Sequence, residues 1–461
     1  MKTPLSFTPI HALLEKREDV AWASYWEASG RVIPFYPAYI DALMRKIKAS
    51  GAKRLFIIHS DRALFLAAFL AALHAGIPVV FPPSDAPGLL KDILEPEDGL
   101  FTDQNALSPI SPSFITMDDV TIDPQRPVKF QRFNPLKASI TFYTSGSTGS
   151  PKAISKVLKQ LEEEIIVLEE MWGIQDNRTT FLSTVPHHHM YGLLFSLLWP
   201  ICAGYPIRSQ TFAYWEDVLR ECNQESYIVS SPSHLSRFPA FMESHERANI
   251  KAAFSSGAPL SFESSQEACS LLGICPIEVY GSTETGGIAY RQQREKDELW
   301  TKFKDVNLFL GEEENLCVKS PFLPHNGPYQ TADRVTLQGE HHFHLLGRTD
   351  SIVKIEGKRV CLLEIEHHLR ELEFIKEAAV LLLDTFNRDE LGAVVVLSPK
   401  GKRALRALGK EKFVRNIRKS LSTHLEIITL PRKWRFVSEL PLNQNGKRSH
   451  LLLKNGFVER S

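Results

Sequence analysis

The stretch from Thr144 to Lys152 has the residue types of a loop that binds phosphate. Gly146 and Gly149 let the backbone turn tightly and approach a ligand closely. The groups that can donate to phosphoryl oxygens are four hydroxyls and one ammonium, those of Thr144, Ser145, Ser147, Thr148 and Lys152. The apolar run that precedes the loop, from Ala138 to Tyr143, predicts a strand.

On these residues alone, an exposed turn without a ligand is the competing interpretation, because Ser/Gly clusters often mark ordinary loops. The P-loop of kinases and GTPases is excluded. That motif needs a Gly-Lys pair followed by Ser or Thr at the start of a helix, and here Pro151 separates Gly149 from Lys152. The stretch therefore predicts a phosphate loop of another type.

Small and hydroxyl residues also follow three other predicted strands. The segments are Ser231-Pro232, Ser256 to Pro259 and Gly281 to Gly287. Ligands gather at the carboxyl ends of the strands in open α/β sheets, so these segments are candidates for a shared site. Within the last of them, Thr283 can donate a hydrogen bond to phosphate, and Glu284 offers a carboxylate for magnesium.

Histidines are grouped at two places, where a metal site is one possibility. The run His187 to His189 follows a predicted strand, but consecutive side chains cannot all converge on one ion from a strand or helix. A loop that supplies one ring to a pocket wall fits this run better. Alternation places His342 and His344 on one face of a strand as a possible metal pair, and a plain β-strand is the favoured interpretation.

The elements that must position these residues alternate between strands and helices. Leu55 to Ile58 and Pro78 to Phe81 predict strands on either side of an apolar helix from Ala63 to Ala75, which Gly76 ends. This βαβ pattern indicates a parallel sheet. The segment from Phe101 to Asn134 is predicted to be an irregular, proline-rich connection.

An amphipathic helix is expected from Val157 to Trp172. Five glutamates of this segment are expected to form its solvated face: Glu162, Glu163, Glu164, Glu169 and Glu170. Beyond Trp300 the pattern changes to short strands, and the final part of the chain has the pattern of a small α+β unit. There, the basic segment from Lys400 to Lys419 predicts a solvated face or a landing site for an acidic or phosphorylated partner.

Length and composition limit the classes of protein. A chain of 461 residues exceeds one ordinary domain, and its 43% hydrophobic and 23% charged content are those of a globular protein. The formal net charge is zero, so no general attraction to nucleic acid or to an anionic membrane is expected. The sequence predicts no transmembrane segment, and residues 1–19 lack the apolar core of a secretory signal.

The six cysteines occur at irregular spacings without a Cys-x-x-Cys pair. This pattern predicts neither a disulfide framework nor a zinc site. They are expected to be small buried residues in a reducing cytoplasm, and they are Cys202, Cys222, Cys269, Cys275, Cys317 and Cys361.

Taken in chain order, the motifs resemble those of the adenylate-forming superfamily of acyl- and aryl-CoA synthetases, luciferases and nonribosomal adenylation domains. Thr144 to Lys152 is similar to the family's phosphate loop, and Tyr280 to Glu284 to its Tyr-Gly-x-Thr-Glu motif. Gly347 to Arg359 resembles its hinge region, and Gly446-Lys447 its terminal lysine motif. The resemblance extends from Leu55 to Lys447 and is greatest to compact bacterial acyl or aryl acid ligases.

This resemblance implies an α/β fold in two domains. A large N-terminal domain of mixed sheets with flanking helices, residues 1–350, would bind ATP and an acid. A small, mobile α+β domain, residues 351–461, would carry Lys447. Asp350 matches the hinge about which the family rotates its C-terminal domain between two reaction steps.

In the family's reaction, a carboxylate attacks the α-phosphate of ATP to give acyl-AMP and pyrophosphate, and a thiol then displaces AMP. By resemblance, Lys447 would bridge the attacking carboxylate and the phosphate. Thr283 and a magnesium ion on Glu284 would hold the α-phosphate region. The loop from Thr144 to Lys152 would position the departing pyrophosphate.

The resemblance also implies the nucleoside contacts. Asp333 would accept hydrogen bonds from the ribose hydroxyls, with Arg348 beside it. The residues implied to bind the adenine end of the nucleotide are Gly257, Ala258, Pro259, Tyr280 and Gly281. After the rotation, the path of the thiol would be lined by Lys354, Gly357 and Arg359.

For the acid, the informative motif is His187 to Gly192. Amino-acid-activating members carry an Asp there, whereas this chain has no acidic residue, so an amino acid is disfavoured. The residues expected to line the pocket are His189, Tyr191, Ser230, Ser256 and Val279, and His189 is also a candidate catalytic residue. This set fits an aromatic acid or a short to medium unsaturated acyl chain.

The sequence departs from the family pattern at two places. Ala332 stands where the family has glycine, and a positive φ at this position would strain the backbone by about 1 kcal/mol. The region before the phosphate loop is shorter than in many synthetases, so part of the N-terminal layer is expected to be trimmed.

The sequence therefore predicts a cytoplasmic acid–thiol ligase that uses ATP and magnesium and transfers an acyl group to CoA or to the phosphopantetheine of an acyl carrier protein. Two alternatives stay open. One is a stand-alone adenylation protein dedicated to a carrier domain, which the basic segment from Lys400 to Lys419 would dock. The other is a non-catalytic nucleotide-binding homologue, against which the intact Lys152, Glu284 and Lys447 argue.

Overall fold

The structure is a computed structural model that describes residues 7–16, 36–83, 85–110, 113–123, 125–145, 151–174, 179–222, 225–239, 249–311, 314–324, 327–348, 352–355, 358–384, 389–422, 425, 427, 430–441 and 450–458. Backbone contacts divide the chain into two compact units. The first comprises Met1–Asn307 and Val318–Tyr329, and the second comprises Leu308–Cys317 and Gln330–Ser461. The predicted hinge residue Asp350 lies outside the described residues, so the boundary drawn there stays a prediction.

The first unit contains a six-stranded sheet with the strand order β4-β3-β1-β2-β5-β6. Its strands are β1 (Arg54–Ile58), β2 (Val79–Phe81), β3 (Asp98–Thr102), β4 (Ser113–Ile115), β5 (Ser139–Ser145) and β6 (Pro151–Val157). The first five strands are parallel, and β6 is antiparallel to β5. The carboxyl ends of the parallel strands therefore meet at one edge, where the predicted phosphate loop leaves β5.

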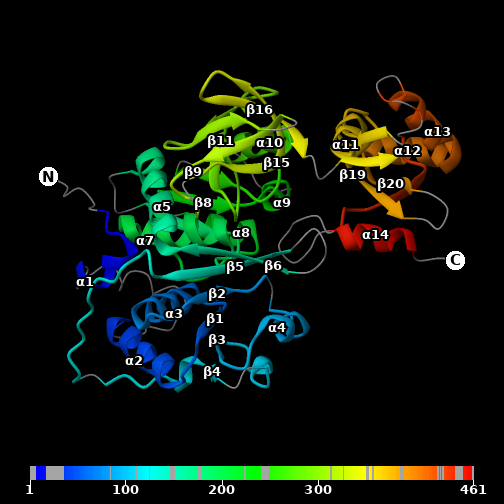
Figure 1. The fold of residues 1–461 in the computed structure, drawn as a ribbon. Coiled ribbons are helices and arrows are strands. Elements are labelled where there is room, and N and C mark those ends of the chain that lie inside the picture. Colours follow the sequence, from blue (N-terminus) through cyan, green and yellow to red (C-terminus); the bar gives the residue numbers. More distant parts are fainter. Residues whose placement is uncertain are drawn as a thin grey trace. The chain divides into compact units, whose positions relative to one another are not determined.

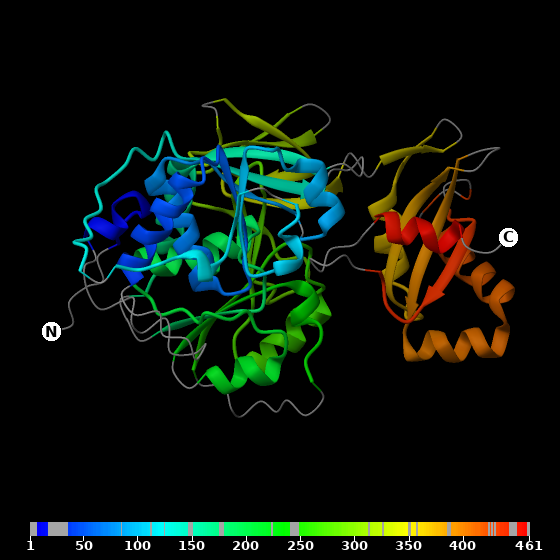
Figure 2. The same ribbon diagram turned by 90° about the horizontal axis from the view of Figure 1, so that it is seen from below.

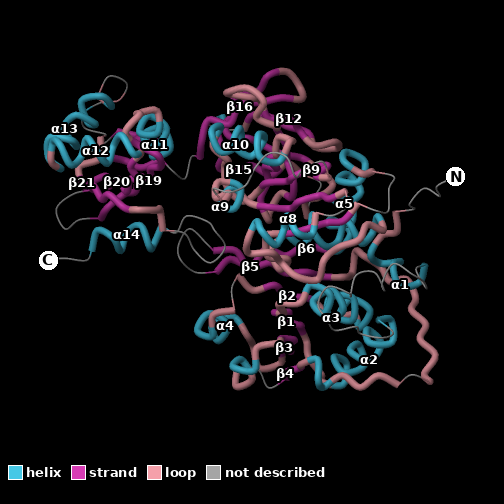
Figure 3. Tube along the Cα trace, turned by 180° about the vertical axis from the view of Figure 1, so that it is seen from behind, coloured by secondary structure: helices cyan, strands magenta, loops and turns pink. Residues whose placement is uncertain are grey.

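Helices cover both faces of this sheet. The helices α2 (Tyr36–Ala49) and α3 (Arg62–Ala75) lie on one face, and α4 (Pro87–Ile93) lies on the other (Figure 1 and Figure 3). Asp61 caps α3 by accepting hydrogen bonds from two backbone N–H groups of its first turn, and Gly76 ends the helix with a left-handed φ of 74°. The predicted βαβ unit with its glycine stop is confirmed. The short helices of this region are η1 (Ile10–Ala12), α1 (Leu13–Lys16), η4 (Asn105–Leu107) and η5 (Met117–Asp119).

The prediction that Phe101 to Asn134 is irregular is wrong in part. The strand β3 extends to Thr102, and β4 pairs with it in parallel. The sequence of β3, Asp-Gly-Leu-Phe-Thr, lacks the alternation expected of a strand, and its charged first residue is buried. Arg54 neutralises that residue, because its guanidinium donates to both carboxylate oxygens of Asp98 at 2.8 and 2.6 Å.

The first unit also contains strands in the order β12-β11-β10-β9-β8-β7. Their bounds are β7 (Thr180–Ser183), β8 (Ser226–Ser230), β9 (Ile250–Ser255), β10 (Ile277–Ser282), β11 (Gly286–Arg291) and β12 (Trp300–Lys302). The strands β7 to β10 are parallel, and β10 and β11 form an antiparallel hairpin. The helix α5 (Leu158–Trp172) precedes these strands. The helices between them are α6 (Met190–Leu193), the π-helix η6 (Leu194–Leu198), α7 (Trp199–Ala203), α8 (Trp215–Glu221), α9 (Pro232–Leu235) and α10 (Phe262–Leu272).

The prediction that the glutamates of α5 form a solvated face is wrong for three of the five. Glu162 accepts hydrogen bonds from the backbone N–H and the ring of His11, both at 2.9 Å. Glu164 is also buried, and Glu169 accepts from the indole N–H of Trp199 at 2.7 Å. Other parts of the chain cover polar positions of this helix as well as its apolar face. Some of its glutamates are therefore buried.

The expectation that all six cysteines are unpaired is also wrong. Cys269 of α10 and Cys275 form a disulfide. Gly273, with a φ of 70°, ends α10 and reverses the chain, so the two Cα atoms lie 4.2 Å apart. Of the free cysteines, Cys222 and Cys317 are half-buried and are not core residues.

The remaining strands lie in the second unit, except that β13, β14 and β15 each also include residues of the first. They are β13 (Asn307–Leu310), β14 (Asn315–Lys319), β15 (Tyr329–Gln338), β16 (His342–Arg348), β17 (Ile352–Ile355), β18 (Lys358–Cys361), β19 (Ile375–Asp384), β20 (Asp389–Leu397) and β21 (Lys433–Val437). Its helices are α11 (Leu362–Arg370), α12 (Pro399–Leu408), α13 (Lys410–Leu421) and α14 (His450–Val458). The final part of the chain contains both strands and helices, as its sequence pattern predicts, and the extent of the small domain, residues 351–461, stays a prediction.

The sheet β19-β20-β21 has an apolar core on each face. Ala378 and Val380 pack with α11 and α13, whereas the alternate residues Ala379 and Leu381 pack with Leu453 of α14. Figure 2 shows α14 lying across the sheet. Successive side chains of a strand point to opposite faces, so strands buried on both sides are apolar at consecutive positions. Within the described residues, no helix combines the length and the apolar character that crossing a bilayer requires.

Candidate functional site

The parallel strands β7 to β10 of the first unit end at one edge. Ser230, the last residue of β8, lies opposite Ser255 of β9 and shares a hydrogen bond with Thr184, with the two hydroxyl oxygens 2.8 Å apart. Ser256 Oγ donates to the carbonyl oxygen of Val279 at 2.8 Å. Three predicted pocket residues, from the ends of β8 and β9 and from the interior of β10, thus lie on neighbouring strands.

The other two predicted pocket residues, His189 and Tyr191, lie at the start of α6. His189 is the N-cap residue, and its ring packs on that of His188 with centroids 4.2 Å apart. The ring of Tyr191 contacts that of Phe195 at 4.9 Å. Burial raises the pKa of the Tyr191 hydroxyl well above its usual range, so this side chain is neutral.

A tight turn follows β9 and contains Gly257, Ala258 and Pro259. All three residues are exposed. Gly257 has a φ of 94°, a conformation that L side chains rarely adopt, so the turn requires glycine at this position. The turn therefore offers backbone surface to a ligand at the carboxyl edge of the strands.

The last part of β10 is supported by aromatic packing. The ring of Tyr280 lies 5.5 Å from that of Trp300, which also receives the guanidinium of Arg291 at 4.5 Å from its centroid. A Cβ added to Gly281 would lie 2.3 Å from the carbonyl oxygen of Gly286, so the hairpin requires glycine there. These contacts fix the backbone that leads into the next turn.

Thr283 and Glu284 lie in the turn that joins β10 to β11. Two neighbouring hydroxyls hold this turn. The N–H of Thr285 donates to Ser282 Oγ at 3.2 Å, and the N–H of Ser282 donates to Thr285 Oγ1 at 3.1 Å. The turn is thus closed without the side chains of the two predicted phosphate and magnesium residues.

The ends of the predicted phosphate loop lie close to this turn. Thr144 pairs with Lys152 across β5 and β6, and its hydroxyl donates to the Lys152 carbonyl oxygen at 3.4 Å. Lys152 Nζ lies 3.7 Å from Glu284 Oε1. The backbone of Ser145 ends β5, and residues 146–150, which include Gly146, Ser147, Thr148 and Gly149, lie outside the described residues.

The position of Glu284 fits a magnesium ion. Its side chain is 24% exposed and presents carboxylate oxygens, the ligand type that this hard cation prefers, beside the end of a loop with the composition of a phosphate site. Its partner Lys152 is 62% exposed, so the pair is open to an incoming anion.

A group of buried polar residues, which the sequence did not indicate as part of the site, contacts the turn from the interior. Lys156 Nζ donates to the carbonyl oxygens of Glu284 at 3.1 Å and of Phe322 at 2.9 Å, and Gln160 Nε2 donates to the latter at 3.1 Å. Glu164 accepts from the N–H of Gly287 at 2.8 Å. Burial raises the pKa of Glu164 to about 7, against the opposing charge of the ammonium nearby. Glu164 lies three residues after Leu161 and four before Leu168, which is the spacing of the apolar face of α5. This spacing could have predicted that Glu164 is buried.

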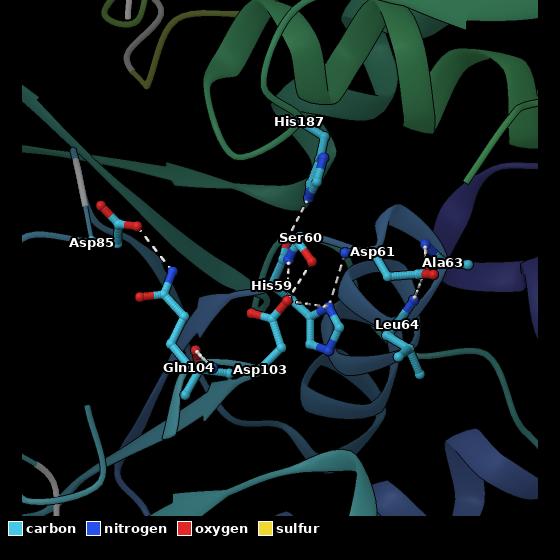
Figure 4. A network of polar contacts seen from close by, with 10 residues as sticks. His59, Ser60, Asp61, Ala63, Leu64, Asp85, Asp103, Gln104 and His187 are labelled. Atoms are coloured by element: carbon cyan, nitrogen blue, oxygen red, sulfur yellow. Dashed lines mark hydrogen bonds and ion pairs between the residues drawn. The ribbon is translucent and has the colours of Figure 1, made fainter. Parts of the chain in front are cut away.

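The histidine loop is anchored in the interior, as Figure 4 shows. His187 Nε2 lies 2.9 Å from the carbonyl oxygen of His59, which can only accept, so Nε2 carries the proton. Burial lowers the pKa of His187 to about 3. His188 is likewise held neutral, because burial lowers its pKa well below the usual value.

The residue that His187 contacts belongs to a polar network at the carboxyl edge of the first sheet (Figure 4). The N–H of Asp61 donates to His59 Nδ1 at 3.0 Å. Asp103, which follows β3, accepts from both the N–H and the hydroxyl of Ser60. The loops after β1 and β3 are therefore bonded to each other and, through His187, to the loop after β7.

This arrangement predicts an acid-sensitive folding stability. The pKa of His187 is depressed in the folded chain, so as pH falls below about 6.5 the unfolded chain binds a proton first and stability is lost. At pH 5 the loss from this residue is about 2 kcal/mol, at about 1.4 kcal/mol per pH unit.

His187→Gln should reduce the difference in unfolding free energy between pH 7 and pH 5 by that amount in urea titrations. His341→Gln, at an exposed histidine, should leave the difference unchanged, and an equal effect of the two substitutions would contradict the assignment.

In the second unit, Asp333 and Arg348 lie opposite each other in β15 and β16. Arg348 Nη1 lies 3.5 Å from Asp333 Oδ1. The backbone N–H of the aspartate is held by Thr331 Oγ1 at 3.1 Å. Ala332 lies in the extended strand without a positive φ, so the strain considered for this departure from the family pattern is absent.

The remaining predicted residues of the second unit are only partly described. The backbones of Lys354 and Arg359 pair across β17 and β18, which form an antiparallel hairpin. Gly357, Asp350 and Lys447 lie outside the described residues.

Comparison with known proteins connects this geometry to a family. Residues 20–307 match the sequence model of the family described as AMP-binding enzyme. The chain belongs to the AMP-binding enzyme family. The predicted resemblance to the adenylate-forming superfamily, the α/β fold class and the assignment to its acid–thiol ligases are therefore confirmed.

Individual relatives of this AMP-binding enzyme differ in acceptor. A 4-coumarate–CoA ligase from Cereibacter sphaeroides is 26% identical over 68% of this chain and 70% of its own length. A D-alanine–D-alanyl carrier protein ligase from Staphylococcus aureus is 24% identical over 87% of this chain and 89% of its own. Among solved structures, an ATP-bound RpMatB-BxBclM chimera superposes with a TM-score of 0.81 at 17% identity, over 98% of this chain and 99% of its own. The use of ATP by this AMP-binding enzyme is supported by the family match.

For an AMP-binding enzyme, Asp333 offers a direct test of nucleotide binding. Asp333→Asn removes the negative charge but keeps one acceptor oxygen, so we expect the KM for ATP to rise about tenfold, equivalent to about 1.4 kcal/mol, with little change in kcat. Steady-state kinetics of acid-dependent pyrophosphate exchange measure both constants. Asp92→Asn, at an exposed aspartate of α4, is the control, and a lower kcat with an unchanged KM would refute a ribose-binding role.

Proposed function

We propose that this chain activates a carboxylic acid with ATP and transfers the acyl group to a thiol. In the first step a carboxylate oxygen bonds to the α-phosphorus of ATP, and the bond from that phosphorus to the pyrophosphate oxygen breaks. In the second step the thiol loses its proton to solvent, its sulfur bonds to the acyl carbon, and the bond from that carbon to the AMP oxygen breaks. A cytoplasmic location, where ATP and CoA are available, is part of the proposal.

The observation that carries the proposal is the contact between Lys152 and Glu284. These two residues come from the end of the phosphate loop and from the Thr-Glu turn, and their charged atoms lie 3.7 Å apart. A bound triphosphate would draw the ammonium to its oxygens. Glu284 would hold magnesium, which neutralises phosphate charge, and Thr283 would donate to the α-phosphate region.

Other residues would bind the nucleoside and the charge that develops in the reaction. We assign the adenine end to Gly257, Ala258, Pro259, Tyr280 and Gly281, which line the edge described above. Asp333 would accept from the ribose hydroxyls, with Arg348 beside it. Lys447 would bridge the attacking carboxylate and the α-phosphate, where negative charge builds up.

The acid would lie against the edge formed by β8, β9 and β10. The residues assigned to its pocket are His189, Tyr191, Ser230, Ser256 and Val279. The tyrosine is neutral and half-buried, and no carboxylate stands in the histidine loop to hold a substrate ammonium. We therefore propose an aromatic acid or a short to medium acyl chain, and not an amino acid.

The thiol would come from CoA or from the phosphopantetheine of an acyl carrier protein. Asp350 would act as the hinge of a rotation, after which Lys354, Gly357 and Arg359 line the thiol's path. Turnover with free CoA compared with turnover on a holo carrier protein decides the acceptor. A clear preference for the carrier would make the chain a dedicated adenylation protein.

The experiment that tests the function is acid-dependent exchange of labelled pyrophosphate into ATP across a panel of carboxylic acids. Aromatic and short to medium-chain acids are expected to support exchange, and amino acids are not. If no acid supports exchange and no AMP is released, the chain would instead be a non-catalytic nucleotide-binding homologue.

A further inference from the structure

Two buried titratable side chains of the first unit, Lys156 of β6 and Glu164 of α5, contact the hairpin turn that contains Glu284. Lys156 Nζ donates to the carbonyl oxygen of Glu284 at 3.1 Å and to that of Phe322 at 2.9 Å. Just after the turn, Glu164 Oε1 accepts from the N–H of Gly287 at 2.8 Å. The turn is therefore bonded near both of its ends by side chains that approach from the interior.

Lys156 also connects the turn to the phosphate loop. It lies four residues after Lys152 in β6, so both side chains belong to one face of that strand. Lys152 Nζ lies 3.7 Å from the carboxylate of Glu284, and Lys156 Nζ bonds to the carbonyl oxygen of the same residue. The strand that leaves the phosphate loop thus contacts a single turn residue at both its side chain and its backbone.

The burial of these two polar side chains requires a physical reason. Lys156 and Glu164 are each 2% exposed, and removing a polar or charged group from water is unfavourable unless hydrogen bonds compensate. A pair of apolar side chains of similar volume would fill the interior at least as well. Such a pair would leave the backbone groups of the turn unbonded, so the bonds to those groups are what the two polar side chains contribute.

The fit between Glu164 and the turn is close. A Cβ added to Gly286 would lie 2.5 Å from Glu164 Oε2, and Gly286 has a φ of 72°. The glycine lets the backbone rest directly on the carboxylate. A displacement of the carboxylate would therefore shift the residues that follow Glu284.

We propose that Lys156 and Glu164 are positioning residues, which hold the turn of Thr283 and Glu284 against the end of the phosphate loop in the geometry needed for ATP with magnesium. For its kinetic consequence the inference rests on the proposed function. Both side chains act through the backbone of the turn.

The kinetic test compares substitutions that keep or remove the bonds to the turn. Lys156→Met preserves the shape of the side chain and removes its donors, so the KM for ATP in acid-dependent exchange should rise at least tenfold, with a smaller change in kcat. Lys156→Arg keeps donors and should recover most of the loss. Glu164→Gln keeps an acceptor and should affect the KM less than Glu164→Ala.

Glu162 provides a matched control on the same helix. It is buried as deeply, at 1% exposure, but it bonds to His11, away from the turn. Glu162→Gln should leave the KM for ATP within twofold of wild type. An equal rise in this control, or a Lys156→Arg variant no better than Lys156→Met, would overturn the inference.

A second measurement does not depend on turnover. Amide hydrogen exchange of residues 280–290 should become at least tenfold faster in Lys156→Met and stay unchanged in Glu162→Gln. If the wild-type protein shows no pyrophosphate exchange, the proposed function fails while this comparison still decides the inference. Unchanged amide protection in a folded Lys156→Met protein would overturn it.

Discussion

Lys447→Ala is expected to lower acid-dependent pyrophosphate exchange about a thousandfold while leaving thioester formation from supplied acyl-AMP within a few-fold of wild type. A carboxylate is repelled by the phosphate it attacks, so a cation at the point of attack contributes mainly in the transition state, and loss of one such group costs about 10²–10³ in kcat. The second step begins with an adenylate already formed and does not need that cation. The assignment of Lys447 rests on the Gly446-Lys447 motif.

The two half-reactions are measured separately, by labelled pyrophosphate exchange and by thioester formation from synthetic acyl-AMP. Lys91→Ala, at an exposed lysine of α4, is the control for loss of positive charge and should behave as wild type in both assays. Equal loss of both half-reactions in Lys447→Ala would contradict the assignment of Lys447 to the first half-reaction alone. It would also remove the reason to propose that residues 351–461 rotate.

Glu284→Gln should have the next largest effect, a reduction in exchange of about 10²–10³, the range found when a group that stabilises transition-state charge is removed. The substitution keeps the size of the side chain and loses its charge, and magnesium prefers carboxylate oxygen over amide oxygen. It also removes the ionic partner of Lys152 at 3.7 Å. We expect the magnesium concentration for half-maximal exchange to rise several-fold.

Titration of magnesium at fixed ATP measures this shift. Glu263→Gln, at an exposed glutamate of α10, is the matched control and should leave the titration unchanged. A Glu284→Gln protein with reduced exchange but an unaltered magnesium dependence would show that the carboxylate acts otherwise than as a metal ligand.

The parts of the fold that follow from local pattern were predictable. The apolar helix α3 with its glycine stop and the strand β2 lie where periodicity and punctuation predict them. The strand β3 and the buried glutamates of α5 were not predictable in this way. Their polar residues are satisfied by partners distant in sequence, such as Arg54 for Asp98 and His11 for Glu162.

The candidate site likewise contains some residues that the sequence could indicate and others that it could not. Thr283, Glu284 and Lys152 belong to short motifs whose residue types suit phosphate and magnesium, so the sequence could indicate them. Lys156 has no local signature, because a lysine in a strand is usually solvated and its two partners are carbonyl oxygens 128 and 166 residues away. Only the packing of α5 and β6 against the hairpin turns an ordinary lysine into a candidate positioning residue.

The links between the loops of the first unit have a consequence for how it unfolds. Arg62, at the start of α3, donates to the carbonyl oxygens of Ser196 and Arg208, and His187 bonds to His59. Each contact joins the loop after β1 to the segment between β7 and β8. Opening either sheet would therefore leave a buried hydrogen-bond donor of the other sheet without its acceptor. The two sheets should therefore melt in a single cooperative transition, and proteases should find no partly opened species that retains one sheet.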